Sequence, residues 1–306
     1  MRVVFCGTPE FSVEPLKQLI ANKHNVVAVY TQPDRGVGRG RKIQYSAVKD
    51  CALAHNIQVI QPPSLKDKAA IEELRALKPD LLVVVAYGLI LPQSVLDIPT
   101  ISCWNIHASL LPRWRGAAPI HRALLAGDKT TGVGIMKMEA GLDTGSVYIQ
   151  HECAITENET AQQLHDKLAI MGANALLECI NLLTHDLLPE PMVQDSQHVT
   201  YAHKLKKSES LVSWDETAQQ IDRKIRVLNP WPGVVVNIAG DDYKLWQARV
   251  VTVDSSVAVG EIVLADKNSL IMQCSSGQLQ IDIIQKSGKK RMEIKQFMQS
   301  KSDWFK

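Results

Sequence analysis

The feature that most constrains the fold is an alternation of short β-branched runs with stretches of helical spacing through the first 185 residues. The strand-like runs lie at residues 3–6, 26–31, 59–60, 81–86, 103–107, 132–138 and 147–152. Between them, apolar residues such as Leu16 and Leu19 share one helix face, and 161–183 has the pattern of a long amphipathic helix. The unbroken apolar run at 81–86 indicates a strand buried on both faces. This order predicts an α/β unit with a doubly wound, mostly parallel, Rossmann-like sheet.

A second unit is expected after residues 187–197, where the periodicity stops at Pro189 and Pro191. One helix is indicated by four apolar residues at spacings of 3, 4 and 3, namely Ala218, Ile221, Ile225 and Leu228. Short strand-like runs follow at 234–239, 243–246, 250–253, 261–264, 270–274 and 279–283. Such spacing is typical of a small antiparallel β-barrel of the OB type. The predicted boundaries are 1–189 for the α/β domain, 190–206 for a linker and 207–306 for the barrel.

The charge of the chain is nearly balanced overall but not along its length. With 34 Lys+Arg against 32 Asp+Glu, the net charge is +2, so any affinity for a polyanion must be local. Residues 1–189 carry 18 of each sign, whereas residues 204–306 carry 16 basic against 12 acidic residues. The basic residues of this second part cluster at Lys204, Lys206, Lys207, Arg223, Lys224, Arg226, Lys289, Lys290, Arg291 and Lys295. The clusters favour a polyanion partner, and a solvated surface is the alternative.

Several classes of protein are disfavoured. The first residues have the pattern of a strand, not of a secretory signal. The longest apolar stretch is about seven residues, against the roughly 18 needed to cross a bilayer. The six cysteines stand far apart and form no C-x-x-C pair, which predicts neither a zinc site nor a disulfide framework. We therefore expect a soluble cytoplasmic protein without membrane association.

The usual nucleotide motifs are missing. The first strand-to-helix turn, Gly7-Thr-Pro-Glu-Phe11, has one glycine where a dinucleotide fingerprint needs three, so a nicotinamide-dependent oxidoreductase is disfavoured. Residues 34–42 hold three glycines and four basic residues: Arg35, Arg39, Arg41 and Lys42. We interpret this segment as a mobile basic loop for an anionic partner, with a merely solvated loop as the alternative.

The strand at 103–107 carries the residues best suited to chemistry. Asn105 and His107 are two residues apart, so alternation places both side chains on one face at the carboxyl end of the strand, where open α/β sheets bind ligands. An asparagine amide can stabilise an oxyanion, and a histidine can exchange protons near neutral pH. These groups suit acyl transfer. Because no G-x-S-x-G element or placed cysteine argues for a covalent intermediate, direct attack by an amine is the simplest scheme. Asp143, in a glycine-flanked turn, is the candidate that orients the histidine, unless it is an ordinary turn aspartate.

Motifs in both predicted domains closely resemble those of the methionyl-tRNA formyltransferases, within the folate-dependent formyltransferase superfamily. The matching segments are Phe5-Cys-Gly-Thr-Pro-Glu-Phe11, Thr31-Gln-Pro-Asp-Arg35, Asn105-Ile-His-Ala-Ser-Leu-Leu-Pro112, Arg115-Gly-Ala-Ala-Pro-Ile120, Gly141-Leu-Asp-Thr-Gly145 and Asn229-Pro-Trp-Pro-Gly233. The motifs around 105–120 and 141–145 are common to the superfamily. The first residues, the basic loop and the carboxyl-terminal unit narrow the resemblance to the tRNA enzymes.

The resemblance implies formyl transfer from 10-formyltetrahydrofolate to the α-amine of methionine on initiator tRNA, for translation initiation, without a metal. We expect the protein to be a monomer. Asn105, His107 and Asp143 match the catalytic residues of the family. Ser109, Leu110, Leu111 and Pro112 match its folate-contacting loop, with a cis Leu-Pro bond, and the pterin is expected against the main chain of 84–91. Arg39 matches a basic-loop arginine directed at the tRNA acceptor end. The other expected tRNA contacts are Arg41, Lys42, Lys206, Lys207 and Lys289.

Two other functions stay open at this point. The first is formylation of a small amine, such as glycinamide ribonucleotide or an amino sugar nucleotide. Those relatives share the pattern of Asn105, His107 and Asp143, but a small acceptor does not require the unit beyond residue 200. The second is a noncatalytic RNA-binding protein whose first domain is only a scaffold.

Overall fold

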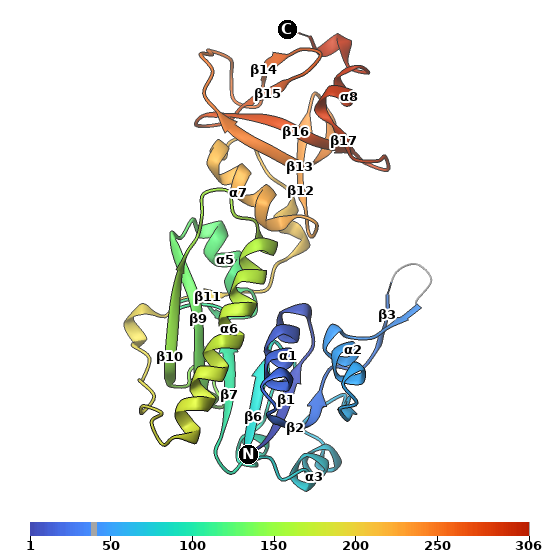
Figure 1. The fold of residues 1–306 in the computed structure, drawn as a ribbon. Coiled ribbons are helices and arrows are strands. Elements are labelled where there is room, and N and C mark those ends of the chain that lie inside the picture. The colour runs from blue at the N-terminus through green and yellow to red at the C-terminus, as the bar shows by residue number, and fades with distance from the viewer. Residues whose placement is uncertain (38–41, 306) are drawn as a thin grey trace. The chain divides into compact units, whose positions relative to one another are not determined.

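The computed structural model describes residues 1–37 and 42–305, and its contacts divide the chain into two compact units (Figure 1). Unit 1 comprises Met1–Ile120, Lys129–Ile155 and Gln163–Ala202. Unit 2 comprises His121–Asp128, Thr156–Gln162 and His203–Lys306. The functional boundaries expected from the sequence, 1–189, 190–206 and 207–306, remain a proposal.

Unit 1 is built on a seven-stranded sheet with the order β10-β9-β7-β6-β1-β2-β5. Its strands are β1 (Arg2–Gly7), β2 (Asn25–Tyr30), β5 (Val59–Ile60), β6 (Leu81–Val85), β7 (Ser102–His107), β9 (Thr130–Lys137) and β10 (Val147–Ala154). The five strands from β5 to β7 pair in parallel, and β9 and β10 pair antiparallel to their neighbours. Every residue of β6 is buried, as the apolar run predicted. The predicted doubly wound, mostly parallel sheet is confirmed.

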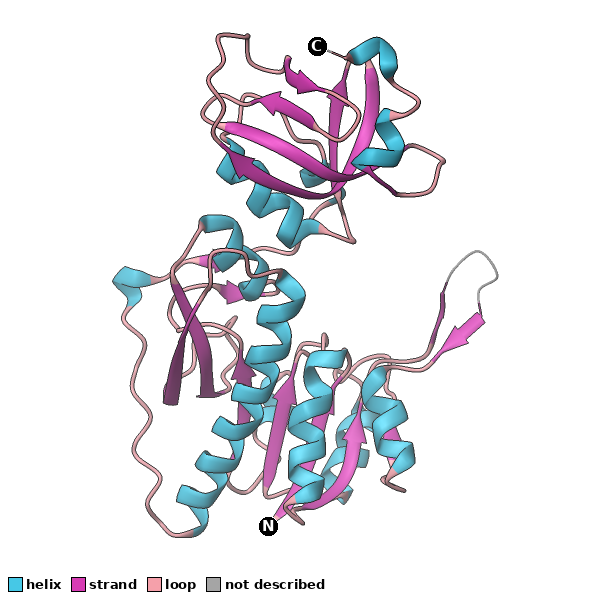
Figure 2. Cartoon of the chain, turned by 45° about the horizontal axis from the view of Figure 1, so that its top comes forward, coloured by secondary structure: helices cyan, strands magenta, loops and turns pink. Residues whose placement is uncertain are grey.

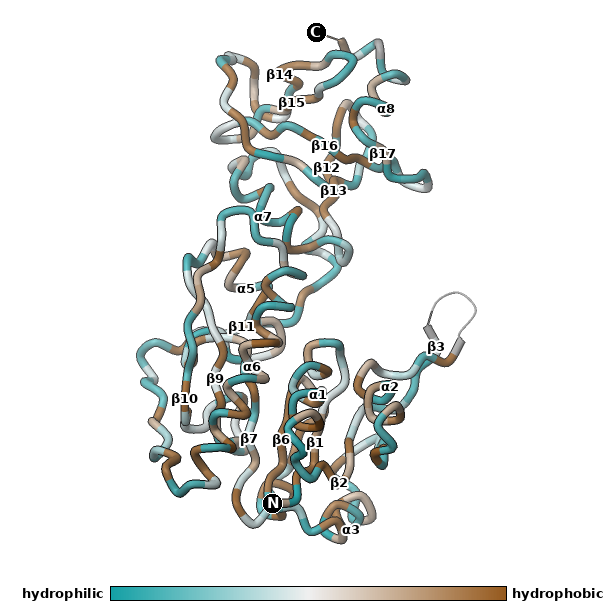
Figure 3. The backbone as a smooth tube through the Cα atoms, viewed as in Figure 1, coloured by the Kyte–Doolittle hydropathy of each residue, from teal (hydrophilic) through white to brown (hydrophobic). Residues whose placement is uncertain are grey.

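Helices cover both faces of this sheet. They are η1 (Glu10–Ser12), α1 (Val13–Ala21), α2 (Ala47–Ala54), α3 (Lys68–Ala76), α4 (Gln93–Leu96) and α6 (Ala161–Thr184). Most of α5 (Pro119–Ala126) belongs to unit 2. Figure 2 shows α1 and α6 on the same face. On the other face, Leu74 of α3 and Val95 of α4 join a core with Val4 and Leu82. The central strands β1 and β6 are mostly brown, the hydrophobic colour, in Figure 3.

Helix α6 is long and apolar enough, by length and composition alone, to cross a membrane. Its apolar side is nevertheless used inside unit 1. Leu164, Leu168 and Leu176 are each fully buried, and a Cβ at Gly172 would lie 2.7 Å from a methyl group of Ile106 on β7. Burial of this face against the sheet is the behaviour of a core helix.

The segment 34–42 differs from the predicted irregular loop. Strands β3 (Arg35–Val37) and β4 (Lys42–Gln44) pair antiparallel, so the loop prediction was wrong at both ends. Directly before β3, the Asp34 carboxylate accepts hydrogen bonds from Lys49 Nζ and from Gln61 Nε2. The bond from Lys49, followed by that from Gln61, lowers the pKa of Asp34. The backbone pairing of residues 35–37 with 42–44 explains why both ends of the segment have regular structure although its glycines alone favour a loop.

All six cysteines are free thiols, five of them buried and Cys153 half-buried. Burial raises the pKa of Cys6, and raises those of Cys103 and Cys179 to about 12 and that of Cys274 to about 11. Because the thiolate is the nucleophile, we expect iodoacetamide to label Cys153 first in the native protein at pH 8. Peptide mass spectrometry after brief labelling measures this, with labelling in denaturant as the control. Equal native labelling of Cys103 and Cys153 would contradict it.

Unit 2 contains an antiparallel sheet with the order β12-β13-β16-β15-β14, and β17 pairs with β16. Its elements are η3 (Lys207–Ser210), α7 (Ala218–Leu228), β12 (Val234–Ile238), β13 (Asp241–Val251), β14 (Ile262–Ala265), β15 (Leu270–Gln273), β16 (Gln278–Lys286), β17 (Met292–Glu293), α8 (Ile294–Met298) and η4 (Ser302–Trp304). The predicted antiparallel carboxyl-terminal unit is confirmed. The runs predicted as separate strands at 243–246 and 250–253 form one strand, β13, whose register with β16 shifts around Gln247. Such an irregularity interrupts the sequence alternation without ending the strand.

Candidate active site

The candidate site lies at the carboxyl ends of β1, β6 and β7, where the winding of the sheet changes direction. Strand β1 pairs with β2 on one side and with β6 on the other, which is the usual position of a ligand crevice in such sheets. Three non-glycine residues in the segments around these strand ends have left-handed backbone angles: Ala86 (φ 44°), Trp114 (φ 63°) and Asp143 (φ 50°). Conformations of this kind cost roughly 1–3 kcal/mol each and gather at functional sites.

His107, the last residue of β7, has both ring nitrogens close to oxygen atoms. Its side chain is 6% exposed, and Nε2 lies 2.9 Å from the Trp114 carbonyl oxygen. Because a carbonyl oxygen only accepts, this bond requires the proton to be on Nε2. Nδ1 lies 3.7 Å from Asp143 Oδ2, beyond hydrogen-bond distance but within the range of an ion pair. The nitrogen that can gain a proton is therefore Nδ1, which faces a carboxylate.

Asn105 lies on the same strand, two residues before His107, and is half-buried. Within the described parts of the chain, its amide group makes no side-chain hydrogen bond. A partly buried amide with unused donors suits an oxygen atom of a substrate.

Asp143 is held in a tight turn after β9. The Gly116 N–H donates to Asp143 Oδ2 at 2.7 Å. A Cβ at Gly145 would lie 1.7 Å from the Lys137 carbonyl oxygen, so only glycine fits there. The structure thus brings His107 and Asp143, which are 36 positions apart in the sequence, into one cluster with Asn105.

The predicted folate loop follows β7 directly. Ser109 is buried and its hydroxyl donates to the Arg113 carbonyl at 2.6 Å, while Leu110 is half-buried. Leu111 is buried, packs with Met136 and Val147, and is joined to Pro112 by a cis peptide bond, as expected. The hydroxyl of Ser109 therefore fixes the loop itself, which the sequence did not indicate.

The segment after β6 has main-chain N–H groups that are not used within the described residues. The N–H groups of residues 87–91 donate to no other group in residues 1–37 and 42–305. The Tyr87 carbonyl accepts from Thr8 Oγ1 at 2.9 Å and from Gln32 Nε2 at 3.3 Å. Gly88 has φ 84°, a left-handed backbone angle at which a residue with a side chain would be strained. Unpaired main-chain donors at this edge fit the hydrogen-bonding ring of a pterin.

The expected tRNA contacts are spread over the chain. Arg39 and Arg41 lie outside the described residues, and Lys42 begins β4 in unit 1. Lys206, Lys207 and Lys289 are exposed in unit 2.

Also in unit 2, the Arg122 guanidinium holds the Glu209 carboxylate at two nitrogens and lowers its pKa. Glu209 accepts in turn from the Lys206 N–H. This ion pair fixes the backbone of the Lys206–Lys207 cluster.

Sequence reasoning missed three residues that shape the site. Trp114 contacts His107 through its main-chain carbonyl, and Gln194 and Thr200 fall in the segment 190–206 that was expected to be a linker. In the structure, part of this segment is η2 (Ser196–His198) and β11 (Tyr201–Ala202), and β11 pairs with β8 (Arg115–Gly116), which follows the predicted folate loop in the sequence. Main-chain and amide contacts of this kind cannot be predicted from a sequence pattern.

Comparisons with known proteins show the family of the chain. The family model described as "Formyl transferase" matches residues 1–180, and that described as "Formyl transferase, C-terminal domain" matches residues 204–302. A methionyl-tRNA formyltransferase of Stenotrophomonas maltophilia is 48% identical over 303 residues, which is 99% of this chain and 98% of that protein.

Solved structures share the fold at low sequence identity. Methionyl-tRNA formyltransferase from Clostridium thermocellum has a TM-score of 0.55 at 17% identity, over 82% of this chain and 94% of that one. HypX from Aquifex aeolicus, in complex with tetrahydrofolic acid, has a TM-score of 0.66 at 15% identity. That match covers 97% of this chain and 47% of HypX, so this chain spans about half the length of HypX.

Proposed function

The chain belongs to the family of methionyl-tRNA formyltransferases, and from this premise we propose that it transfers a formyl group from 10-formyltetrahydrofolate to the α-amine of initiator methionyl-tRNA. The observation that carries the proposal is the cluster at the end of β7, where a buried His107 faces Asp143 beside the Asn105 amide. Oxyanion donors and a proton-exchanging group are what acyl transfer between amines requires.

In the proposed mechanism, the neutral amine of the methionyl group attacks the formyl carbon. A carbon–nitrogen bond forms and the carbonyl electron pair moves onto oxygen. The Asn105 amide and the positive charge of protonated His107 stabilise the resulting oxyanion, and Asp143, which faces Nδ1, stabilises the imidazolium. When the oxyanion collapses, the bond to the folate N10 breaks with its electron pair. N10 takes up one proton and the amine loses one, so no external oxidant or reductant is needed.

We propose that formyl transfer and tRNA binding are carried by different parts of the chain. Residues 1–189 carry the chemistry, with the Ser109–Pro112 loop and the main chain of 84–91 holding the folate. Residues 207–306 hold the tRNA through Lys207 and Lys289, and residues 190–206, which include Lys206, connect the two. The basic segment with Arg39, Arg41 and Lys42 reaches the acceptor end. We propose that a single chain suffices and that it acts in the cytoplasm, where translation begins.

One assay tests the function against its rivals. The chain is incubated with 10-formyltetrahydrofolate and, in parallel, with initiator methionyl-tRNA, glycinamide ribonucleotide or an amino sugar nucleotide. We expect formylation of the tRNA alone. Formylation of a small amine in its place would support a small-molecule enzyme, and tRNA binding without any formyl transfer would support a noncatalytic RNA-binding protein.

Binding of tRNA should weaken as salt rises. If Lys206, Lys207 and Lys289 contact phosphates, each releases counterions on binding, so the logarithm of the association constant falls linearly with the logarithm of salt concentration. Replacing all three with glutamine should make this slope shallower by about 2–3 units. Filter binding from 50 to 300 mM KCl measures it, and Lys129→Gln in unit 1 is the control. An unchanged slope would remove these lysines from the interface.

A further inference from the structure

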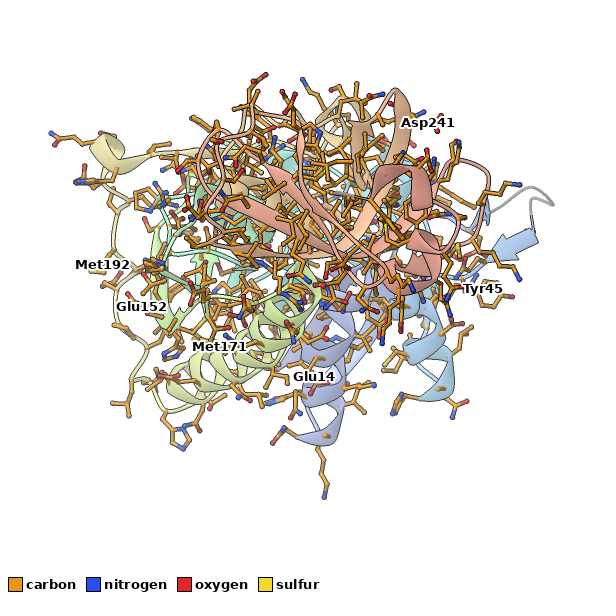
Figure 4. All side chains as sticks on the ribbon, turned by 90° about the horizontal axis from the view of Figure 1, so that it is seen from above. Glu14, Tyr45, Glu152, Met171, Met192 and Asp241 are labelled. Carbon is orange, nitrogen blue, oxygen red and sulfur yellow. The ribbon has the colours of Figure 1, made fainter. Side chains whose placement is uncertain are left out.

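A segment beyond the predicted α/β domain, residues 192–202, contacts residues of the candidate site and is anchored by main-chain bonds at both ends. Met192, labelled in Figure 4, exchanges two hydrogen bonds with Val147 of β10, at 2.9 and 2.8 Å. At the other end, Tyr201 and Ala202 pair in parallel with Arg115 and Gly116. All of these residues belong to unit 1, so the segment is part of the site-bearing unit.

Gln194 joins this segment to the turn that carries Asp143. Its amide nitrogen donates to the Asp143 carbonyl at 2.8 Å and to the Gly145 carbonyl at 2.7 Å. Its amide oxygen accepts from Arg115 Nε at 3.0 Å and Nη2 at 2.8 Å, and Arg115 is 8% exposed. Two donors and an acceptor on one planar group are the property of a carboxamide. Neither glutamate nor leucine can replace this set.

Thr200 binds the main chain at Trp114, whose carbonyl is the second group in contact with the His107 ring. Its hydroxyl accepts from the Trp114 N–H at 2.9 Å, and its carbonyl accepts from the Arg115 N–H at 2.9 Å. The Trp114 carbonyl is the acceptor for His107 Nε2. Thr200 therefore holds, on both sides, the residue whose carbonyl fixes the imidazole.

We infer that Gln194 and Thr200 are positioning residues that align the two groups in contact with the His107 ring, Asp143 at Nδ1 and the Trp114 carbonyl at Nε2. Asp143 and Trp114 both have left-handed backbone angles, which a non-glycine residue keeps only when neighbouring groups hold it. Gln194 supplies that hold for Asp143, and Thr200 supplies it for Trp114. The catalytic consequence of this inference rests on the proposed function.

The test compares four variants with the wild-type chain. Gln194→Leu and Thr200→Val keep side-chain volume but remove the side-chain hydrogen bonds, and the bond from the Arg115 N–H to the Thr200 carbonyl is kept in Thr200→Val. Thr200→Ser keeps the hydroxyl, and Gln197→Leu changes an exposed glutamine of the same segment. We expect Gln194→Leu and Thr200→Val to lower kcat by about 10- to 100-fold, the scale for a misplaced catalytic group, with little change in the KM for 10-formyltetrahydrofolate. Thr200→Ser and Gln197→Leu should stay within about 3-fold of wild type.

A second measurement does not depend on turnover. The ¹⁵N resonances of the His107 imidazole should report the Nε2–H form in the wild type and in Thr200→Ser, and a mixture of both neutral forms in Thr200→Val. If the wild type transfers no formyl group, the proposed function fails, and these resonances still decide whether the ring is held. If the wild type is active, wild-type kcat in Gln194→Leu and Thr200→Val would overturn the inference. An unaltered imidazole spectrum in Thr200→Val would also overturn it, as would equal losses in Thr200→Val and Thr200→Ser.

Discussion

An Asn105→Ala variant is expected to formylate methionyl-tRNA at least about 100-fold more slowly than the wild-type chain, the scale measured for loss of one oxyanion donor. The reason is the state of the amide in the structure: it is half-buried at the end of β7 and makes no side-chain hydrogen bond within the described residues. A donor that the protein does not use can stabilise a charge that develops only in the transition state, so its removal should lower kcat more than it raises KM.

Single-turnover kinetics with saturating 10-formyltetrahydrofolate and initiator methionyl-tRNA measure this effect. Asn105→Asp provides the sharper comparison, because it keeps the shape but places a carboxylate where the oxyanion would form, and we expect a loss at least as large. Asn181→Ala, at an exposed position on α6, is the control. A kcat within about 5-fold of wild type in Asn105→Ala would exclude this amide from the chemistry, since a true oxyanion donor contributes at least about 100-fold.

The fold was largely predictable because its signals are local. The unbroken apolar run of β6 and the Asn105/His107 alternation on β7 depend only on neighbours in the sequence, and both are observed. The hairpin of β3 and β4 was missed because strand pairing compensated for glycines that alone favour a loop. Strand β13 was predicted as two pieces because the register irregularity around Gln247 breaks the alternation.

The site was predictable only as far as its side chains have recognisable chemistry. Asp143 was a candidate because glycines flank it, although nothing local placed it against His107. The hydrogen bonds of Gln194 and Thr200 join residues 49 to 86 positions apart, so they exist only once the chain has folded. A carbonyl such as that of Trp114 has no sequence signature at all, because every residue carries one.

The second large effect concerns His107 and Asp143 as a pair. His107→Ala should lower kcat at least about 100-fold, which corresponds to about 2.7 kcal/mol of transition-state stabilisation. Asp143→Ala should have an effect of similar size, because it removes the carboxylate that faces Nδ1 and the acceptor of the Gly116 N–H. If Asp143 acts only through the imidazole, the double variant should be no slower than His107→Ala.

A double-mutant cycle on kcat measures this coupling. The exposed pair His151 and Glu178, with side chains 43% and 48% exposed and 2.8 Å between the paired atoms, is the matched control, and its double alanine variant should keep wild-type kcat because exposed pairs contribute little. Additive losses for His107→Ala and Asp143→Ala would mean that Asp143 contacts the reacting groups independently of the ring. Asp143 would then have a role of its own and would not act by orienting the imidazole. The bonds from Gln194 to the Asp143 turn would then not serve to align the carboxylate with Nδ1. Strong non-additivity would instead mean that the Asp143 carboxylate and the His107 ring act together in catalysis, as the proposed positioning by residues 192–202 requires.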